Sequence, residues 1–227
     1  MQKKLMFKSY LDFLKDNYPL YMQNMQSEEL ENMERLYYLI NDVYISSSFF
    51  NRDEYLTRNF YNLMKEYRTY YSRILLLIPL NDKYLIDALI RLLIEKLYRI
   101  IYGSYHLHLE EGSIRRHERR KMSERLETFD VKDKELLDTL YNDYSKLIHH
   151  TDSTETDLLN FKQLTKIDVA LIDYVIEVVE KLNLIYIKNV FVIIINEGNL
   201  DLASNLTLKD VMQENFKDIL KEEGITV

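Results

Sequence analysis

A basic segment between residues 113 and 125 stands out from an otherwise acidic chain. It holds six basic and two acidic side chains, a local charge of +4, whereas the 227-residue chain has a net charge of −7. Arg115 and Arg116 are followed four residues later by Arg119 and Arg120, so a helix here carries a ridge of arginines. Because guanidinium groups bind phosphate through paired hydrogen bonds, the ridge predicts a contact with RNA or nucleotide phosphates. Ion pairs with an acidic neighbour are the alternative, and the sequence leaves both open.

Two histidines offer the nearest approach to a metal site. His106 and His108 are followed by Glu110 and Glu111, but no two histidines have the one-turn spacing of common zinc hydrolases. A polar segment of this kind is more often solvated than metal-bound. The chain has no cysteine, which excludes thiolate chemistry and cysteine-ligated zinc, and it has no glycine-rich phosphate loop. We therefore expect no metal and no other cofactor.

A third group of residues lies at 141–150, with the sequence YNDYSKLIHH. A helix ending in Ser145, three residues and His149 is followed by a loop of Thr, Ser, Asp and Glu at 151–156. This arrangement resembles the HEPN-like families (higher eukaryote and prokaryote nucleotide-binding domains), whose signature is an arginine, a polar residue, a few more residues and a histidine. The segment DALIRLLIEKL at 87–97 looks like the Arg/Glu-bearing helix of such proteins. The resemblance covers residues 81–163.

The resemblance implies a site chemistry that this chain follows in part. In HEPN ribonucleases, arginine and histidine from two protomers meet across a dimer and cleave RNA without metal. Tyr144 stands here where those enzymes have the arginine, and Tyr144, Ser145 and His149 are the candidate catalytic residues of a degenerate motif. His149 could keep the acid–base role, and Arg115 or Arg116 could supply a cation from a second protomer. Because a phenol is neutral at pH 7, we expect little or no ribonuclease activity.

The resemblance also implies a biological role. It predicts a HEPN-like component of a bacterial or phage defence or toxin–antitoxin type system, which binds RNA or a nucleotide or acts as a regulator, as a homodimer. Two alternatives stay open. One is a helical adaptor with no nucleic-acid role, whose acidic, tyrosine-rich surface meets a partner protein. The other is a metal-independent ribonuclease with a rearranged site.

The elements that would position these residues are helices. With 47% hydrophobic residues but 4 Gly and 2 Pro, the composition favours an all-α bundle of about seven to nine helices with a HEPN-like core. Apolar stripes at 83–105 and 130–149 predict a central antiparallel pair. In the first of these helices Asp87, Arg91, Glu95 and Arg99 repeat every four residues, which predicts supporting ion pairs.

Helix boundaries follow from capping residues. We expect N-caps at Ser27, at Asn81 or Asp82, at Thr165 or Asp168, and a last short helix capped by Thr207 with Asp210. Residues 185–195 are rich in Ile and Val, so this stretch is either a continuation of the preceding helix or a short hairpin.

The chain divides into an N-terminal helical layer at 1–80, HEPN-like central helices at 81–165 and C-terminal helices at 166–227, expected to form one compact unit. The most apolar stretch, 169–195, is interrupted by charged residues, so no membrane span is expected. The absence of cysteine fits a cytoplasmic location.

Overall fold

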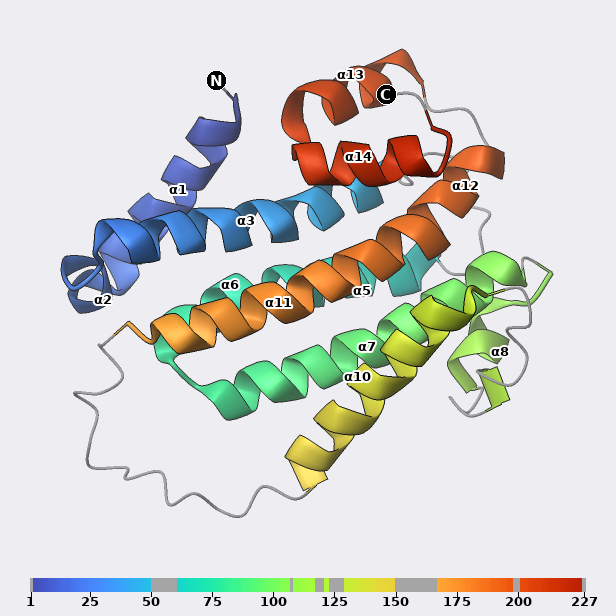
Figure 1. Ribbon diagram of the computed structural model, residues 1–227, viewed down its shortest axis with the longest axis horizontal. Coiled ribbons are helices and arrows are strands. Elements are labelled where there is room, and N and C mark those ends of the chain that lie inside the picture. The colour runs from blue at the N-terminus through green and yellow to red at the C-terminus, as the bar shows by residue number, and fades with distance from the viewer. Residues whose placement is uncertain are drawn as a thin grey trace.

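The computed structural model describes residues 2–49, 61–106, 108–116, 121–122, 129–149, 167–197 and 201–225. Within these residues all regular structure is helical and no strand occurs, so the all-α prediction is confirmed (Figure 1). Eight of the described helices are nine residues or longer. None of the helices in the described ranges is both long and apolar enough to cross a membrane.

The N-terminal helices come first in the chain. They are α1 (Gln2–Asn17), α2 (Pro19–Gln23), α3 (Ser27–Ser48), α5 (Tyr61–Ser72), α6 (Ile74–Leu77) and the 3-10 turn η1 (Ile78–Leu80). The central helices are α7 (Lys83–Tyr105), α8 (Glu111–Arg116) and α10 (Val131–His149). The C-terminal part consists of α11 (Val169–Tyr186), the π-helical segment η3 (Ile187–Phe191), α12 (Val192–Glu197), α13 (Leu202–Val211) and α14 (Glu214–Glu222).

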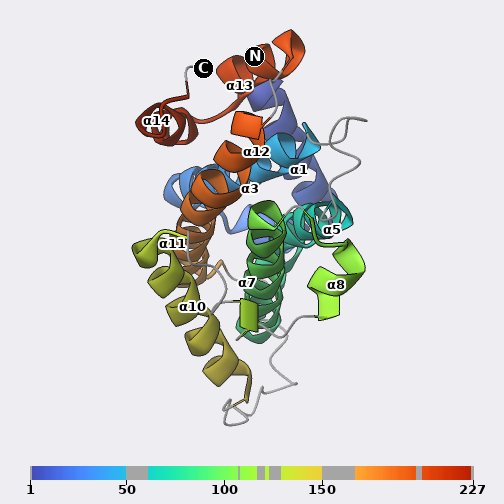
Figure 2. The same cartoon turned by 90° about the vertical axis from the view of Figure 1, so that its right-hand side faces the viewer.

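Helices α7 and α10 form the predicted antiparallel pair. Hydrogen bonds join Arg91 to Ser145 and Tyr98 to Asp138, so residue numbers rise along one helix as they fall along the other. Helices α3 and α11 instead run in the same direction, because Leu39 bonds to Asn183 and Ser46 to Tyr186. Figure 2 shows α7 between α10 on one side and α8 on the other.

One hydrophobic core runs through all three parts of the chain. It includes Leu14 of α1, Leu93 of α7 and Leu182 of α11, each with 0% of its surface exposed. Burial of apolar side chains at helical spacing removes their surface from water, which is the main force that holds such a bundle together.

The stretch at 185–195 is helical, so the hairpin alternative is wrong. Helix α11 continues through the π-helical segment η3 into α12. The wider π-helical turn contains Asn189, which contacts both α10 and α7. Its Nδ2 donates to Asp133 Oδ2 of α10 at 2.8 Å. The Ser104 hydroxyl of α7 donates to the carbonyl of Asn189 at 3.2 Å. These polar contacts tie three helices together.

Several helices have an aspartate as their N-cap. Asp82, Asp168 and Asp201 accept hydrogen bonds from the backbone N–H three residues later, at 2.9, 3.0 and 2.8 Å. They satisfy N–H groups that the helix itself leaves without a partner. The expected caps at 82 and 168 are therefore confirmed.

Two other predicted boundaries are wrong. Gln26 rather than Ser27 is the N-cap of α3, because the Glu29 carboxylate folds back and accepts from the Gln26 N–H at 2.6 Å. Thr207 lies inside α13, where its hydroxyl donates to the Ala203 carbonyl at 2.8 Å. The last helix, α14, instead follows Gln213.

Candidate functional site

Arg91 of α7 joins the central helix pair at the position of the sequence motif. Its Nε donates a hydrogen bond to Ser145 Oγ at 2.7 Å, and its Nη1 donates to Glu95 Oε2 at 3.2 Å. Its Nη2 donates to the Tyr141 hydroxyl, and its guanidinium carbon lies 3.7 Å from the centre of the Tyr141 ring. The side chain is 18% exposed, and these contacts hold the guanidinium in one orientation.

Glu95 lies between two arginines. Its Oε1 accepts from Arg99 at 2.9 Å, in addition to the bond from Arg91. Partial burial alone raises the pKa of Glu95, but the hydrogen bonds from Arg99 and Arg91 outweigh it, so the pKa lies below its ordinary value. The carboxylate is therefore charged at neutral pH. Arg91, Glu95, Arg99, Tyr141 and Ser145, which we call the Arg91 cluster, together carry a charge of +1.

Tyr144, where the ribonuclease motif has its arginine, faces the interior of the protein. It is 3% exposed, and its ring centre lies 6.4 Å from that of Tyr174 on α11. Burial raises the pKa of Tyr144 above its ordinary value, so the phenol is neutral. The next residue, Ser145, reaches α7 instead, because successive residues of an α-helix are rotated by about 100°.

A buried carboxylate lies beside Tyr144. Asp87, one turn before Arg91, is 6% exposed and accepts hydrogen bonds from the Tyr174 hydroxyl and from Lys83 Nζ, both at 2.7 Å. Lys83 Nζ also lies 4.2 Å from the centre of the Tyr174 ring. The charge of Asp87 is therefore paired and hydrogen-bonded, as a buried charge must be. It fixes α11 against α7 next to the candidate site.

His149 is the last residue of α10 and stands one helical turn after Ser145. Its side chain lies outside the described residues, so its acid–base role stays a prediction.

The arginine ridge is only partly described. Arg115 forms ion pairs with Glu66 of α5 at 2.8 Å and with Glu111 at 2.7 Å, as the ion-pair interpretation expects. Arg116 is exposed at the end of α8, and Arg119 and Arg120 lie outside the described residues. Phosphate binding by the ridge therefore stays a prediction. Arg99 of the Arg91 cluster reaches the first described residue of the ridge, because its Nη1 donates to the carbonyls of Ile114 and Arg115 at 3.0 and 2.7 Å.

The two histidines at 106 and 108 are close but do not form a larger group. Their ring centres are 6.0 Å apart, and His106 stacks on Tyr102 at 4.2 Å. In the described part of the chain, no group of three or more His, Asp or Glu side chains could hold a metal ion.

Arg91 and Tyr141 are site residues that the sequence motif at 141–150 does not single out. Asp87, Arg91, Glu95 and Arg99 were expected to pair along one helix, and the two pairs around Glu95 do form. Asp87, however, pairs with Lys83 and leaves Arg91 to reach α10. One sequence pattern does point to these residues. Arg91 lies next to the apolar stripe of α7, and Tyr141 and Ser145 lie next to the apolar stripe of α10.

Comparison with protein-family models, with curated proteins and with solved structures gives no significant match to this chain. Its function therefore has to be inferred from its own residues.

Proposed function

We propose that this chain is a HEPN-like helical protein that binds a phosphate of RNA or of a nucleotide at the Arg91 cluster, without efficient catalysis. The observation that carries the proposal is the hydrogen bond of 2.7 Å from Arg91 Nε to Ser145 Oγ. It brings a permanent cation to the motif helix, next to the position where the HEPN signature has its arginine.

The chemistry of the cluster supports phosphate binding. Arg91 and Arg99 share the Glu95 carboxylate, so two guanidinium groups gather at one place in a chain of net charge −7. A guanidinium that is already oriented by Tyr141 and Ser145 loses less entropy when it binds an anion. The serine hydroxyl is a second polar group at the same place.

The surroundings favour binding over cleavage. Arg91 is held by Glu95 and Tyr141, and the neutral Tyr144 faces Tyr174 in the interior. Phosphodiester cleavage needs cationic groups aimed at the negative charge that develops in the transition state. Tyr144 is not a cation, and Arg91 is directed toward Glu95 and Tyr141, so the cluster is better suited to binding than to cleavage. A regulatory or binding role in a bacterial or phage defence or toxin–antitoxin type system is what the HEPN resemblance implies, and a homodimer is part of the same proposal.

The test measures anisotropy of a labelled single-stranded RNA, and competition by ATP, at low and high salt. Arg91→Ala should weaken RNA binding about tenfold or more, because a hydrogen bond to a charged group contributes about 1.5–3 kcal/mol. The slope of affinity against salt should fall by about one phosphate contact. Arg73→Ala is the matched control, because Arg73 also stacks on a tyrosine, with its guanidinium carbon 5.0 Å from the Tyr70 ring centre.

Three results would contradict phosphate binding without efficient catalysis at the Arg91 cluster. Equal loss in Arg91→Ala and Arg73→Ala would mean that binding is not located at the cluster. No RNA or ATP binding by the wild type at low salt would favour the adaptor alternative. Metal-independent cleavage that is lost in His149→Ala would favour the active ribonuclease.

A further inference from the structure

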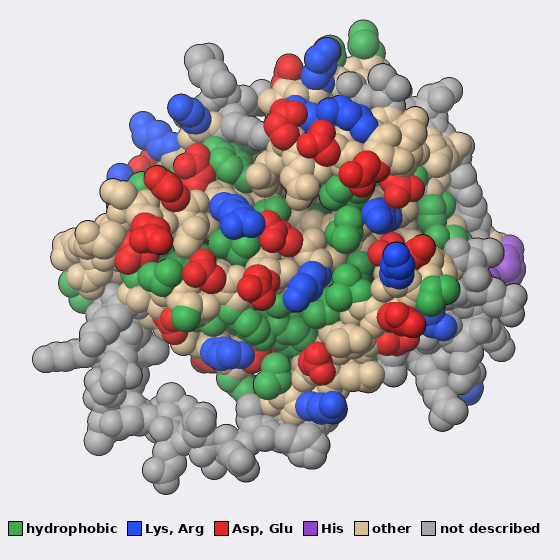
Figure 3. Space-filling view, in the orientation of Figure 1, with side chains coloured by type: hydrophobic (Ala, Val, Ile, Leu, Met, Phe, Trp, Pro, Cys, Tyr) green, Lys and Arg blue, Asp and Glu red, His purple; other side chains and the backbone are tan. Residues whose placement is uncertain are grey.

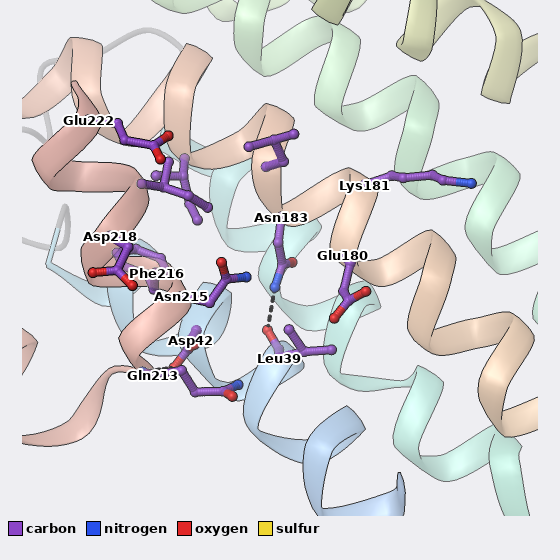
Figure 4. Close-up of a pocket in the computed structure, with 13 residues that line it drawn as sticks. Leu39, Asp42, Glu180, Lys181, Asn183, Gln213, Asn215, Phe216, Asp218 and Glu222 are labelled. Carbon is purple, nitrogen blue, oxygen red and sulfur yellow. Dashed lines mark hydrogen bonds between the residues drawn. The ribbon is translucent and has the colours of Figure 1, made fainter.

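A groove of about 430 Å³ lies between α3, α11 with η3, and α14, and none of its lining residues belongs to the Arg91 cluster (Figure 4). Helix α14 creates it by its strong amphipathic pattern. Phe216, Ile219 and Leu220 are buried against the bundle, which leaves Asp218 and Glu222 at the outer side. The volume is typical of sites that take up a side chain or a small ligand.

The floor of the groove is apolar. Leu184, Ile187 and Ile219 line it, together with Leu39 and Phe216. An aliphatic chain placed on this surface would bury apolar area that is otherwise in contact with water, which is favourable.

The rim of the groove is acidic. Glu180, Asp218 and Glu222 are at its edge, Asp42 is at its inner end, and Lys181 is the one basic residue of the lining. Figure 4 shows Lys181 pointing away from the groove. Glu180 and Asp218 form ion pairs with Arg35 at 2.6 Å and Lys221 at 2.9 Å, but all four side chains are at least 36% exposed. Such surface pairs contribute about 0–1 kcal/mol, so a ligand cation can compete with them.

Amide groups add hydrogen-bonding capacity. Asn215 is exposed and extends toward Asn183 in the middle of the groove (Figure 4). The exposed side-chain amide of Asn215 can both donate and accept hydrogen bonds, so it can pair with the main chain of a ligand.

These features fit one kind of occupant. We propose that the groove binds an extended basic segment of a partner protein. The aliphatic stem of a lysine or arginine lies on the floor, its charged head meets Glu180 or Glu222, and a main-chain carbonyl accepts from Asn215. Long basic side chains combine an apolar stem with a charged end in this way. The carboxylates disfavour phosphate, so the groove and the Arg91 cluster select ligands of opposite charge. The space-filling view shows the mixed charges of the surrounding face (Figure 3).

The experiment selects peptides from a random library displayed on phage with the full chain as bait. The best peptide is then labelled and its affinity for variants is measured by anisotropy. Selected peptides should contain Lys or Arg beside aliphatic residues. Asn215→Trp, which fills the groove from an exposed position, should weaken binding about tenfold, and Glu180→Gln about threefold. The control Glu177→Gln removes a charge one turn earlier on α11, outside the groove, and should leave affinity unchanged.

Absence of any enriched peptide, enrichment of acidic peptides, or equal affinity for Asn215→Trp and wild type would overturn the proposal. If Asn215→Trp does not melt like the wild type, the double variant of Glu180→Gln with Glu222→Gln decides, because both residues are at the surface. RNA binding by the same variants should stay unchanged, so failure here leaves the phosphate-binding proposal standing.

Discussion

The bond between Arg91 and Ser145 should couple the stabilities of α7 and α10, and a double-mutant cycle can measure that coupling. Arg91→Ala removes bonds to Ser145, Glu95 and Tyr141. Hydrogen bonds to charged groups contribute about 1.5–3 kcal/mol each in buried settings. Because the side chain is 18% exposed and water replaces part of what is lost, we expect a total loss of about 2 kcal/mol.

Ser145→Ala should cost about 1 kcal/mol, because Arg91 keeps its other partners and only Nε loses its acceptor. Once Arg91 is absent, the same substitution should cost little. The double variant should therefore be more stable than the sum of the single losses predicts, with a coupling free energy of about 1 kcal/mol.

Urea unfolding followed by circular dichroism gives the free energy of unfolding for all four proteins. A second cycle that pairs Arg73→Ala with Ser145→Ala serves as the control, and it should be additive within about 0.3–0.5 kcal/mol. A coupling between Arg91 and Ser145 within that same range would refute the role of this bond in joining the two helices.

Three further predictions test the core, the motif and the ion pairs. Leu93→Asp should destabilise the protein by about 3 kcal/mol or more in urea unfolding, since Leu93 is fully buried; wild-type stability would show that the face assignment is wrong. Tyr144→Arg places a guanidinium at a buried position, so it should lower the melting temperature and create no ribonuclease activity in a labelled-RNA assay containing a chelator; efficient cleavage would contradict this. The hydrogen bond from Arg115 lowers the pKa of Glu66 in the folded protein. The ion pair should therefore stabilise the fold fully above the unfolded-state pKa of about 4.3, and this stabilisation should be lost as the pH falls through the lower pKa of the folded state. Glu66→Gln should therefore make the melting temperature less sensitive to acid, and an unchanged pH profile would count against the pair.

The sequence by itself determined the class of the fold, most of the helices and several of their ends. Helix formation and capping depend on residues within one or two turns, so the stripe of Leu93 and the caps at Asp82 and Asp168 are visible in the order of residues. The boundary at Ser27 was missed because its neighbour Gln26 forms the cap with Glu29, and local preference alone ranks serine higher.

Only the tertiary structure decided what surrounds the candidate site. Arg91 and Ser145 are 54 residues apart, and their bond depends on how α7 and α10 are rotated about their axes when they pack. The same rotation turns Tyr144 toward Tyr174 and Ser145 toward Arg91, although the two residues are neighbours in the chain. The groove depends on how α14 packs on α3 and α11. Helices α3 and α11 are themselves in contact through residues more than a hundred positions apart, such as Leu39 and Asn183. Spacing along one helix defines its faces, but only packing defines which partner each face meets.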